Sequence, residues 1–229
     1  MKNTLLLLLF IFVLPLQAQR IDFKDIDFDI ADRIASRHKG EELLNVPALV
    51  HKLTAPFTTD ITKFRALYYW VTHNISGDYV MMDTNERMRK EHKNDTVALQ
   101  AWNRRLKINV FKNLRINNQS ICTGYAYLLK VMCKIAEIDC VIINGYGDTE
   151  RKIDITTTAV NHSWNAVRLN GKWYLCDATW AAGYTDMSTM QFIFDYDDSY
   201  FLVEPVEFAQ THRPSDKKWF LIKRPYRSK

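Results

Sequence analysis

One stretch of the chain, NHSWNAVRLNGKWYLCDATW at residues 161–180, constrains the fold more than any other. Two short apolar runs flank Asn170 and Gly171, and an Asn-Gly pair in that setting is the strongest short-range signal for a β-hairpin with a two-residue turn. With these two residues as the turn, residues whose numbers sum to 341 face each other across antiparallel strands. The sequence therefore predicts the hairpin and also the face on which each of its side chains lies.

Alternation along the strands places His162 and Asp177 on the same face of this predicted hairpin. The register sets Asp177 opposite Trp164 and diagonal to His162, which is close enough for the side chains to meet. A carboxylate beside an imidazole can hold the tautomer of the ring and stabilise its protonated form. Cys176 alternates with Asp177, so its side chain is expected on the opposite face.

A third candidate residue lies upstream, in CTGYAYLLKVMCKIAEIDC at residues 122–140. Cysteine, alanine and leucine recur at three- and four-residue steps from Cys122, which predicts a helix that begins at this residue. Unpaired N–H groups at a helix N-terminus favour a thiolate and can hold an oxyanion. We therefore interpret Cys122 as a nucleophile, His162 as its base and Asp177 as the residue that orients the base.

Each of these three residues also has an ordinary structural explanation. Cys122 could be a small buried hydrophobic residue, His162 a hydrogen-bonded core histidine and Asp177 a turn former at a strand end. The three residue types in this order, on a helix and two strands, favour a catalytic triad. No metal site is expected, since the sequence contains no CxxC and no zinc-ligand spacing.

The remaining cysteines and two further histidines receive structural interpretations. With one thiol kept free for chemistry, at most one disulfide can form among Cys133, Cys140 and Cys176, and its pairing stays open. Cys133 and Cys140 are expected in the core or in that bridge. His73 and His212 are expected to be structural or surface groups.

The N-terminal sequence MKNTLLLLLFIFVLPLQA, residues 1–18, is typical of a secretory signal peptide. It has one lysine, an apolar run from Leu5 to Leu14 and a small residue, Ala18, at the expected cleavage position. The apolar run is shorter than the roughly 20 residues of a spanning helix, and no later segment could cross a bilayer. We expect cleavage after Ala18 and a periplasmic or extracellular protein, with an uncleaved N-terminal anchor as the alternative.

Residues 19–58 are expected to form an N-terminal extension, and residues 59–229 a single domain. The chain has 47% apolar residues, enough for one sizeable core.

The sequence TTDITKFRALYYWVTHNI predicts a helix capped by Thr59 or Asp60. Residues 84–118 are expected to begin as a loop and to contain one amphipathic helix in TVALQAWNRRL. A strand, CVIINGYG, precedes the hairpin, and helices followed by antiparallel strands predict an α+β fold.

Positive charge is concentrated in two segments. Residues 84–118 carry nine Lys or Arg against three Asp or Glu, and residues 212–229 carry seven against one. Neither segment contains a recognised nucleic-acid-binding motif with stacking aromatic residues, so nucleic acid is not an expected partner. We expect solvated faces, or peripheral contact with an anionic envelope surface. No cofactor is expected, and the acidic residues lack the spacing of a calcium-binding loop.

The stretches that carry the candidate residues resemble the transglutaminase-like superfamily of papain-like thiol enzymes. The similar stretches are CTGYA, NHSWNAVRLNGKWYLCDATWAAG and YFLVEPVEFAQTHRPSDKKWFLI. The last of these, together with YYWVTHNI, is similar to the kyphoscoliosis peptidase-type branch and its bacterial secreted relatives. The resemblance covers about residues 60–223. It departs at Ser120, where the family usually has Gly, and at Thr123, where it usually has Glu or Gln.

The resemblance implies a papain-like α+β fold, in which a Cys-headed helix packs on an antiparallel sheet that carries His and Asp. It also implies acyl transfer at an amide through a thioester, with Cys122 attacking the carbonyl, His162 transferring the proton and Asp177 holding the tautomer. Water as the acceptor would make the protein a peptidase or amidohydrolase acting on a protein or peptide. A lysine amine as the acceptor would make it a crosslinking transferase.

Further site residues follow from the same resemblance. Trp164 and Trp180 are candidate walls of the substrate site, with core packing as the alternative. The Cys122 backbone N–H is a candidate oxyanion donor, and Gln119 is the candidate for a second donor. Ser120 could crowd the site entrance, which keeps a catalytically weak binding or scaffolding module as a third interpretation.

Overall fold

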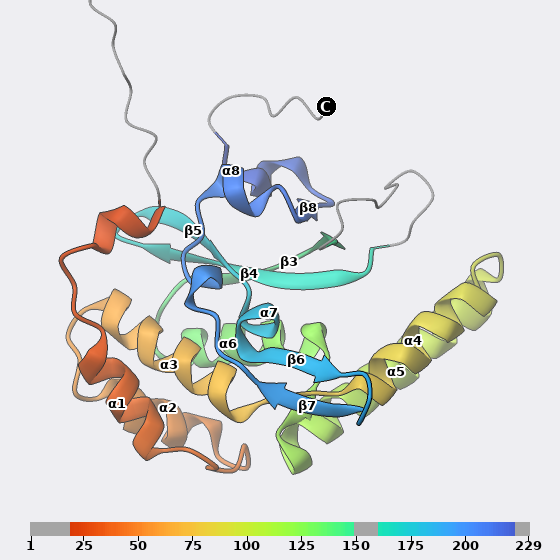
Figure 1. Ribbon diagram of the computed structural model, residues 1–229, viewed down its shortest axis with the longest axis horizontal. Coiled ribbons are helices and arrows are strands. Elements are labelled where there is room, and N and C mark those ends of the chain that lie inside the picture. Colours follow the sequence, from red (N-terminus) through yellow and green to blue (C-terminus); the bar gives the residue numbers. More distant parts are fainter. Residues whose placement is uncertain (1–18, 149–159, 223–229) are drawn as a thin grey trace, which may run out of the picture.

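The computed structural model describes residues 19–148 and 160–222, and the predicted signal peptide at residues 1–18 lies outside them (Figure 1). An antiparallel sheet lies at the centre of the molecule, with a layer of helices that includes α3 (Asp60–Asn74) and α6 (Cys122–Ile135) on one side of it (Figure 1). None of the helices in the described residues is long and apolar enough to span a membrane. This mixture of helices and antiparallel strands confirms the predicted α+β class.

The central sheet has the strand order β5-β4-β3-β8, and all neighbouring strands in it are antiparallel. Its strands are β3 (Cys140–Gly147), β4 (His162–Leu169), β5 (Lys172–Cys176) and β8 (His212–Pro214). Apolar side chains on one face of the sheet belong to the same core as the helices. The other face packs on a smaller apolar cluster, which includes Phe208 at the end of α8 (Pro205–Phe208).

The hairpin formed by β4 and β5 has the predicted register. Leu169 pairs with Lys172, so that the numbers of paired residues sum to 341. Asn170 and Gly171 have φ angles of 50° and 80°, the left-handed conformation that a type I′ turn requires at both positions. Cys176 is buried in the core on the helical side of the sheet, as the alternation predicts. The two-residue turn therefore sets the pairing register, and the register determines which face of the sheet each hairpin side chain occupies.

The helices before the sheet form one core with it. Helices α1 (Asp29–Arg37) and α2 (Val46–Thr54) pack against α3. The predicted cap of α3 is confirmed, because the side chain of Thr59 accepts a hydrogen bond from the backbone N–H of Thr62. Buried side chains of α1, α2, α3 and α6 belong to a single apolar cluster. Helices on both sides of residue 58 therefore share a core, and the predicted domain boundary at that residue stays a prediction.

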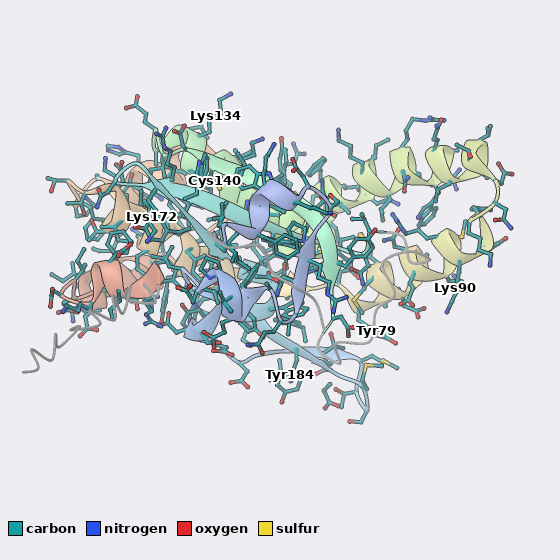
Figure 2. The ribbon with its side chains drawn as sticks, turned by 90° about the horizontal axis from the view of Figure 1, so that it is seen from above. Tyr79, Lys90, Lys134, Cys140, Lys172 and Tyr184 are labelled. Carbon is teal, nitrogen blue, oxygen red and sulfur yellow. The ribbon has the colours of Figure 1, made fainter. Side chains whose placement is uncertain are left out.

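Helices α4 (Tyr79–Glu91) and α5 (Thr96–Asn117) project from the body as an extended pair, which we call the helical arm (Figures 1 and 2). Figure 2 shows α4 running outwards from Tyr79 to Lys90. No side chain of α4 is buried, and in α5 only Val110 and Leu114 are. The arm contains nearly all of the basic segment at residues 84–118, so these charges lie on solvated faces, as expected.

The prediction that the basic segment begins as a loop is wrong. Asp78 and Asp95 cap α4 and α5, because each carboxylate accepts a backbone N–H three residues further along at 2.9 Å. These caps allow two consecutive helices to form where the apolar pattern is weak. The short strand β1 (Ser76–Gly77) pairs in parallel with β2 (Gln119–Ser120) and closes the base of the arm directly before α6.

Candidate active site

Cys122 is the first residue of α6, as the spacing of apolar residues predicts. Ile121, the N-cap residue, has an extended backbone, and its side chain makes no capping hydrogen bond. Cys122 is partly exposed as a residue although its thiol is buried, whereas the three other cysteines are buried as whole residues. A helix N-terminus favours the thiolate over the thiol, so the position of Cys122 at the start of α6 stabilises negative charge on its sulfur.

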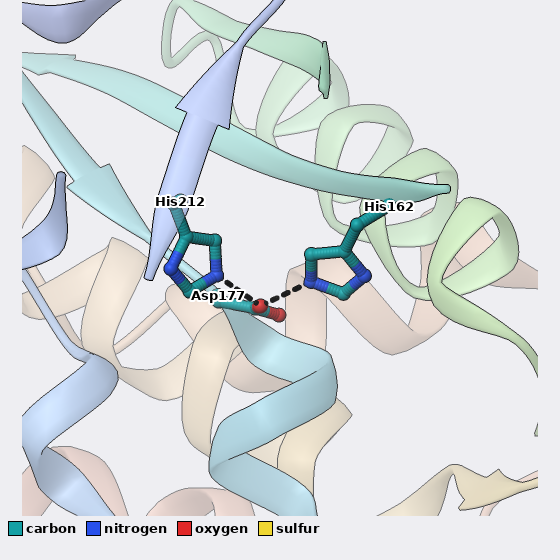
Figure 3. A group of neighbouring side chains, drawn as sticks. All are labelled: His162, Asp177 and His212. Carbon is teal, nitrogen blue, oxygen red and sulfur yellow. Dashed lines mark hydrogen bonds and ion pairs between the residues drawn. The ribbon is translucent and has the colours of Figure 1, made fainter. Parts of the chain in front are cut away.

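His162 and Asp177 meet at the open end of the hairpin (Figure 3). His162 is the first residue of β4, and Asp177 directly follows β5. The Nε2 atom of His162 lies 2.6 Å from Oδ2 of Asp177, and both side chains are buried. Nδ1 of His162 lies on the side of the ring away from Asp177, and the imidazole hydrogen bonds to the thiol of Cys122. The fold thus brings the three predicted residues together in the order thiol, imidazole, carboxylate.

The charges of these groups support one another. Burial raises the pKa of the Cys122 thiol, but the hydrogen bond and charge of His162, together with the Ser163 backbone, outweigh burial and lower the pKa. Burial also opposes the charge on His162, yet Asp177 and Cys122 raise the pKa of this imidazole to about 10. Against the effect of burial, His162 and His212 hold the pKa of Asp177 well below its usual range. These shifts favour a thiolate paired with an imidazolium.

The carboxylate of Asp177 has two hydrogen-bond donors on each of its oxygen atoms. Oδ1 accepts the backbone N–H groups of Thr179 at 2.8 Å and Trp180 at 3.2 Å, at the start of α7 (Ala178–Ala182). Oδ2 accepts from His162 and also faces Nε2 of His212 at 3.0 Å. Because a carboxylate offers about four lone-pair sites, this arrangement leaves the group little freedom to rotate.

His212 was missed as a site residue. It lies in β8 and is fully buried, so it is not the surface group that was one of its two expected roles. The pairing of β8 with β3, which sets His212 opposite Gly147, places the ring beside Asp177. The motif THRP contains this residue, but a three-residue strand has no alternation from which its face could be predicted. His73 has the structural role expected, with its Nδ1 2.8 Å from the carbonyl oxygen of Tyr69.

The two candidate wall residues lie beside the histidines. The ring of Trp180 is centred 5.2 Å from the ring of His162 and 4.3 Å from that of His212. Trp164 is 1% exposed and belongs to the apolar cluster under α8, which fits core packing. Trp180 is only partly buried, which fits a wall of an accessible site. Their roles toward a substrate stay predictions.

Gln119 and Ser120 precede Cys122 and point to different neighbours. The side-chain amide of Gln119 donates to the carbonyl of Gly77 at 3.3 Å, and its oxygen accepts from Asn113 at 3.5 Å. Its predicted role as an oxyanion donor stays a prediction. The Ser120 hydroxyl is buried, has no hydrogen-bond partner among the described residues, and lies against Gly124, where a Cβ would come within 1.9 Å of it. Ser120 therefore packs against the first turn of α6.

A single group of possible metal ligands stands out among the described residues. It consists of His162, Asp177 and His212, whose ligand atoms lie within 4.8 Å of one another. The two nitrogen–oxygen distances of 2.6 and 3.0 Å are those of hydrogen bonds, and both rings share one carboxylate oxygen. Hydrogen bonding therefore accounts for this cluster without an ion.

All four cysteines are free, so none of the possible disulfides is formed. Cys133 and Cys140 are core residues, which was one of the two expectations for them. Burial raises the pKa values of Cys133 and Cys176 well above that of an ordinary thiol. The net shift of these two pKa values is opposite in direction to that of Cys122, where His162 outweighs burial.

Comparison with known proteins shows which family the chain is similar to. Residues 47–178 match the family model described as Transglutaminase-like superfamily. The kyphoscoliosis peptidases of Mus musculus and Homo sapiens are 32% and 33% identical to this chain, over 86% and 77% of its length. Hillarin of Drosophila melanogaster is 27% identical over 87% of the chain. The matches cover 27%, 24% and 24% of these proteins, so the chain spans about a quarter of their length.

Two solved structures are also similar to the chain. The crystal structure of a TGase has a TM-score of 0.38 at 14% identity, covering 80% of this chain and 40% of that one. A provisionally assigned cysteine protease from Cytophaga hutchinsonii has a TM-score of 0.38 at 15% identity, covering 78% of this chain and 51% of that one.

Proposed function

Because the chain belongs to the transglutaminase-like superfamily, we propose that it is a thiol enzyme that acts on amide bonds through Cys122, His162 and Asp177. One observation carries the proposal. The 2.6 Å contact between His162 Nε2 and Asp177 leaves Nδ1 of the ring for the thiol of Cys122. The same imidazole can therefore stabilise the thiolate and pass a proton to a reacting group.

In the first half of the reaction, the Cys122 thiolate attacks the amide carbonyl carbon, which forms a carbon–sulfur bond and an oxyanion. The backbone N–H of Cys122, at the uncapped start of α6, can donate to this oxyanion. The His162 imidazolium then gives its Nδ1 proton to the leaving nitrogen while the carbon–nitrogen bond breaks. The products of this half are a thioester and a free amine.

In the second half, neutral His162 takes a proton from water as the water oxygen attacks the thioester. The carbon–sulfur bond breaks, the acid product leaves, and the thiolate and imidazolium are restored. Asp177 stays ionised throughout and holds the ring with Nε2–H directed at its carboxylate. A lysine amine in place of water would give an isopeptide bond, and the protein would then be a crosslinking transferase.

We favour hydrolysis of a protein or peptide over transfer. The mouse and human relatives, at 32% and 33% identity, are named kyphoscoliosis peptidase, which supports a peptidase or amidohydrolase. Ser120 is fully buried against Gly124, so crowding of an open site entrance by this side chain is no argument for a catalytically weak binding module. The substrate itself remains part of the proposal.

Two measurements test this function. A thiol-reactive probe should label Cys122 in the full chain, with intact mass and peptide mapping as the readout. Labelling should disappear in Cys122→Ala and become much slower in His162→Ala; if His162→Ala is labelled as fast as the unmodified protein, the triad is wrong. Incorporation of a fluorescent amine into a glutamine-containing protein, compared with release of peptide fragments, then separates the transferase from the hydrolase.

Export and an anionic partner surface are further parts of the proposal. Export rests on the sequence of residues 1–18 alone. The helical arm supports peripheral contact with an anionic surface, because its basic side chains at Arg104, Arg105 and Lys107 are exposed and its apolar side chains are largely unburied. Residues 59–229 would form the catalytic domain, with residues 19–58 as an extension.

A further inference from the structure

The carboxylate oxygen that faces the candidate base is shared by a second histidine. We propose that His212 is a positioning residue of the site: its neutral imidazole donates Nε2–H to Asp177 Oδ2 and so holds the carboxylate in place against His162. The inference rests on the proposed function of this site, and it assigns a role to a residue outside the triad. Figure 3 shows both rings directed at the same oxygen atom.

The hydrogen-bond partners of His212 determine its tautomer. Nε2 lies 3.0 Å from Asp177 Oδ2, and an ionised carboxylate can only accept, so the ring proton must be on Nε2. Nδ1 lies 2.9 Å from the hydroxyl of Thr211, which can donate to it. Burial lowers the pKa of His212 and, with the nearby charge of His162, outweighs the carboxylate and the hydrogen bond with the Phe208 backbone, which favours a neutral second ring.

Aromatic rings hold the His212 imidazole in this orientation. Phe208 stacks on it with ring centres 3.8 Å apart and planes 13° apart. Trp180 lies 4.3 Å away, and Trp164 packs edge-on at 5.1 Å. The ring is fully buried, so water does not compete for the carboxylate at this position. The titratable groups that face it from the packed elements of the described chain are Asp177, His162 and Tyr200.

The fourth donor to Asp177 has a chemical consequence. Two backbone N–H groups fix Oδ1, whereas Oδ2 is held by side chains alone. Without His212, only His162 would remain on Oδ2, and this is the ring that must change protonation state during the reaction. A donor that stays neutral at neutral pH keeps the carboxylate ionised and aligned in both states of His162.

The pH dependence of Cys122 alkylation by iodoacetamide, measured on the full chain, tests this role with two matched variants. His212→Gln keeps an N–H donor near the position of Nε2 but packs poorly on Phe208, whereas His212→Leu keeps apolar packing and has no donor. The quantity compared is the acid midpoint, the pH on the acid side at which the alkylation rate of Cys122 is half of its plateau value. We expect His212→Gln to retain the acid midpoint of the unmodified protein. In His212→Leu the midpoint should rise by about one pH unit, which corresponds to an approximately tenfold slower reaction below the midpoint.

The opposite pattern, with His212→Leu retaining the profile and His212→Gln losing it, would mean that His212 acts only by packing. An unchanged profile in both variants would also overturn the proposal. If neither variant folds, nitrogen-15 NMR of the imidazoles in the unmodified chain decides: the proposal requires a neutral Nε2–H tautomer of His212 at neutral pH. An Nδ1–H tautomer would contradict it. Failure of the unmodified protein to react at Cys122 would instead contradict the proposed function and leave the NMR test intact.

Discussion

Nε2 of His162 lies 2.6 Å from Oδ2 of Asp177, although 15 positions separate the two residues in the chain. They are diagonal neighbours at the open end of a hairpin whose turn, Asn170 and Gly171, sets the register. A shift of one residue in this register would move Asp177 to the other face of the sheet. The local turn therefore fixes the position of the His162 imidazole relative to the Asp177 carboxylate.

Replacing Asp177 by Asn should slow alkylation of Cys122 at neutral pH by at least about a hundredfold, because an amide cannot stabilise the His162 imidazolium. The sign of the pH effect follows from the pKa of His162, which Asp177 and Cys122 raise to about 10. Without the carboxylate charge, the imidazolium of His162 loses its proton at lower pH. The upper pH limit of the range in which the Cys122 thiolate is paired with an imidazolium therefore shifts to lower pH. Rates measured from about pH 4 to 11 check both effects.

The matched control for this change is Asp139→Asn, because Asp139 is an exposed carboxylate whose ion pair with Arg168 spans 3.6 Å. We expect it to leave the rate and the profile unchanged. Equal rates for Asp177→Asn and Asp139→Asn would show that the buried carboxylate has no part in the reactivity of the thiol.

Gly147→Ala should displace the His162 ring. A Cβ at position 147 would lie 2.9 Å from two ring atoms of His162, which is closer than side chains tolerate. A shift of a few tenths of an ångström in the base should slow alkylation about tenfold while leaving most of the fold unchanged. Alkylation kinetics, together with circular dichroism, measure this. An unaltered rate in a folded Gly147→Ala protein would mean that the ring position is not critical.

Ser120 and Gly124 should show energetic coupling. A Cβ on Gly124 would lie 1.9 Å from the Ser120 hydroxyl oxygen, so Gly124→Ala alone should lower the free energy of unfolding by about 1–3 kcal/mol. The double variant Ser120→Gly/Gly124→Ala removes the clash and should recover at least about 1 kcal/mol of this loss. Urea unfolding of the four proteins completes the cycle. Strictly additive effects would show that the two positions do not pack as described.

Alkylation of the native protein should modify Cys122 alone. The other thiols are buried, and burial raises the pKa values of Cys133 and Cys176 well above the ordinary range. Peptide mapping after a short exposure to iodoacetamide should find one modified cysteine, and four after unfolding in urea under reducing conditions. Rapid modification of Cys176 in the folded protein would contradict the placement of this residue.

Charge reversal on the helical arm should separate surface binding from chemistry. Arg104, Arg105 and Lys107 are exposed on α5, and their replacement by Glu should weaken binding to anionic lipid vesicles at least about tenfold at low salt. The alkylation rate of Cys122 should be unchanged, because the arm projects from the body (Figure 2). Vesicle sedimentation at two salt concentrations measures the binding. Equal sedimentation of the two proteins would exclude the arm as the contact surface.

Much of the site could be predicted because its determinants are local. The Asn-Gly turn specifies the register of β4 and β5, and the spacing of apolar residues specifies the start of α6 at Cys122. A capping residue such as Thr59 also acts within its own turn of helix. The helical arm was predicted incompletely for the opposite reason: its helices bury few side chains, so the apolar pattern that identifies a helix is weak there.

The sequence by itself determined which residues share a face of the hairpin and where Cys122 stands on its helix, since turn and helix periodicity act over a few residues. Only the tertiary structure decided that His212 would meet Asp177. That contact depends on the pairing of β8 with β3 and on the aromatic rings packed around the imidazole. A three-residue strand is too short to show a periodic pattern that would reveal this pairing or this packing. Contacts between segments that are distant in the sequence decide which strand β8 pairs with.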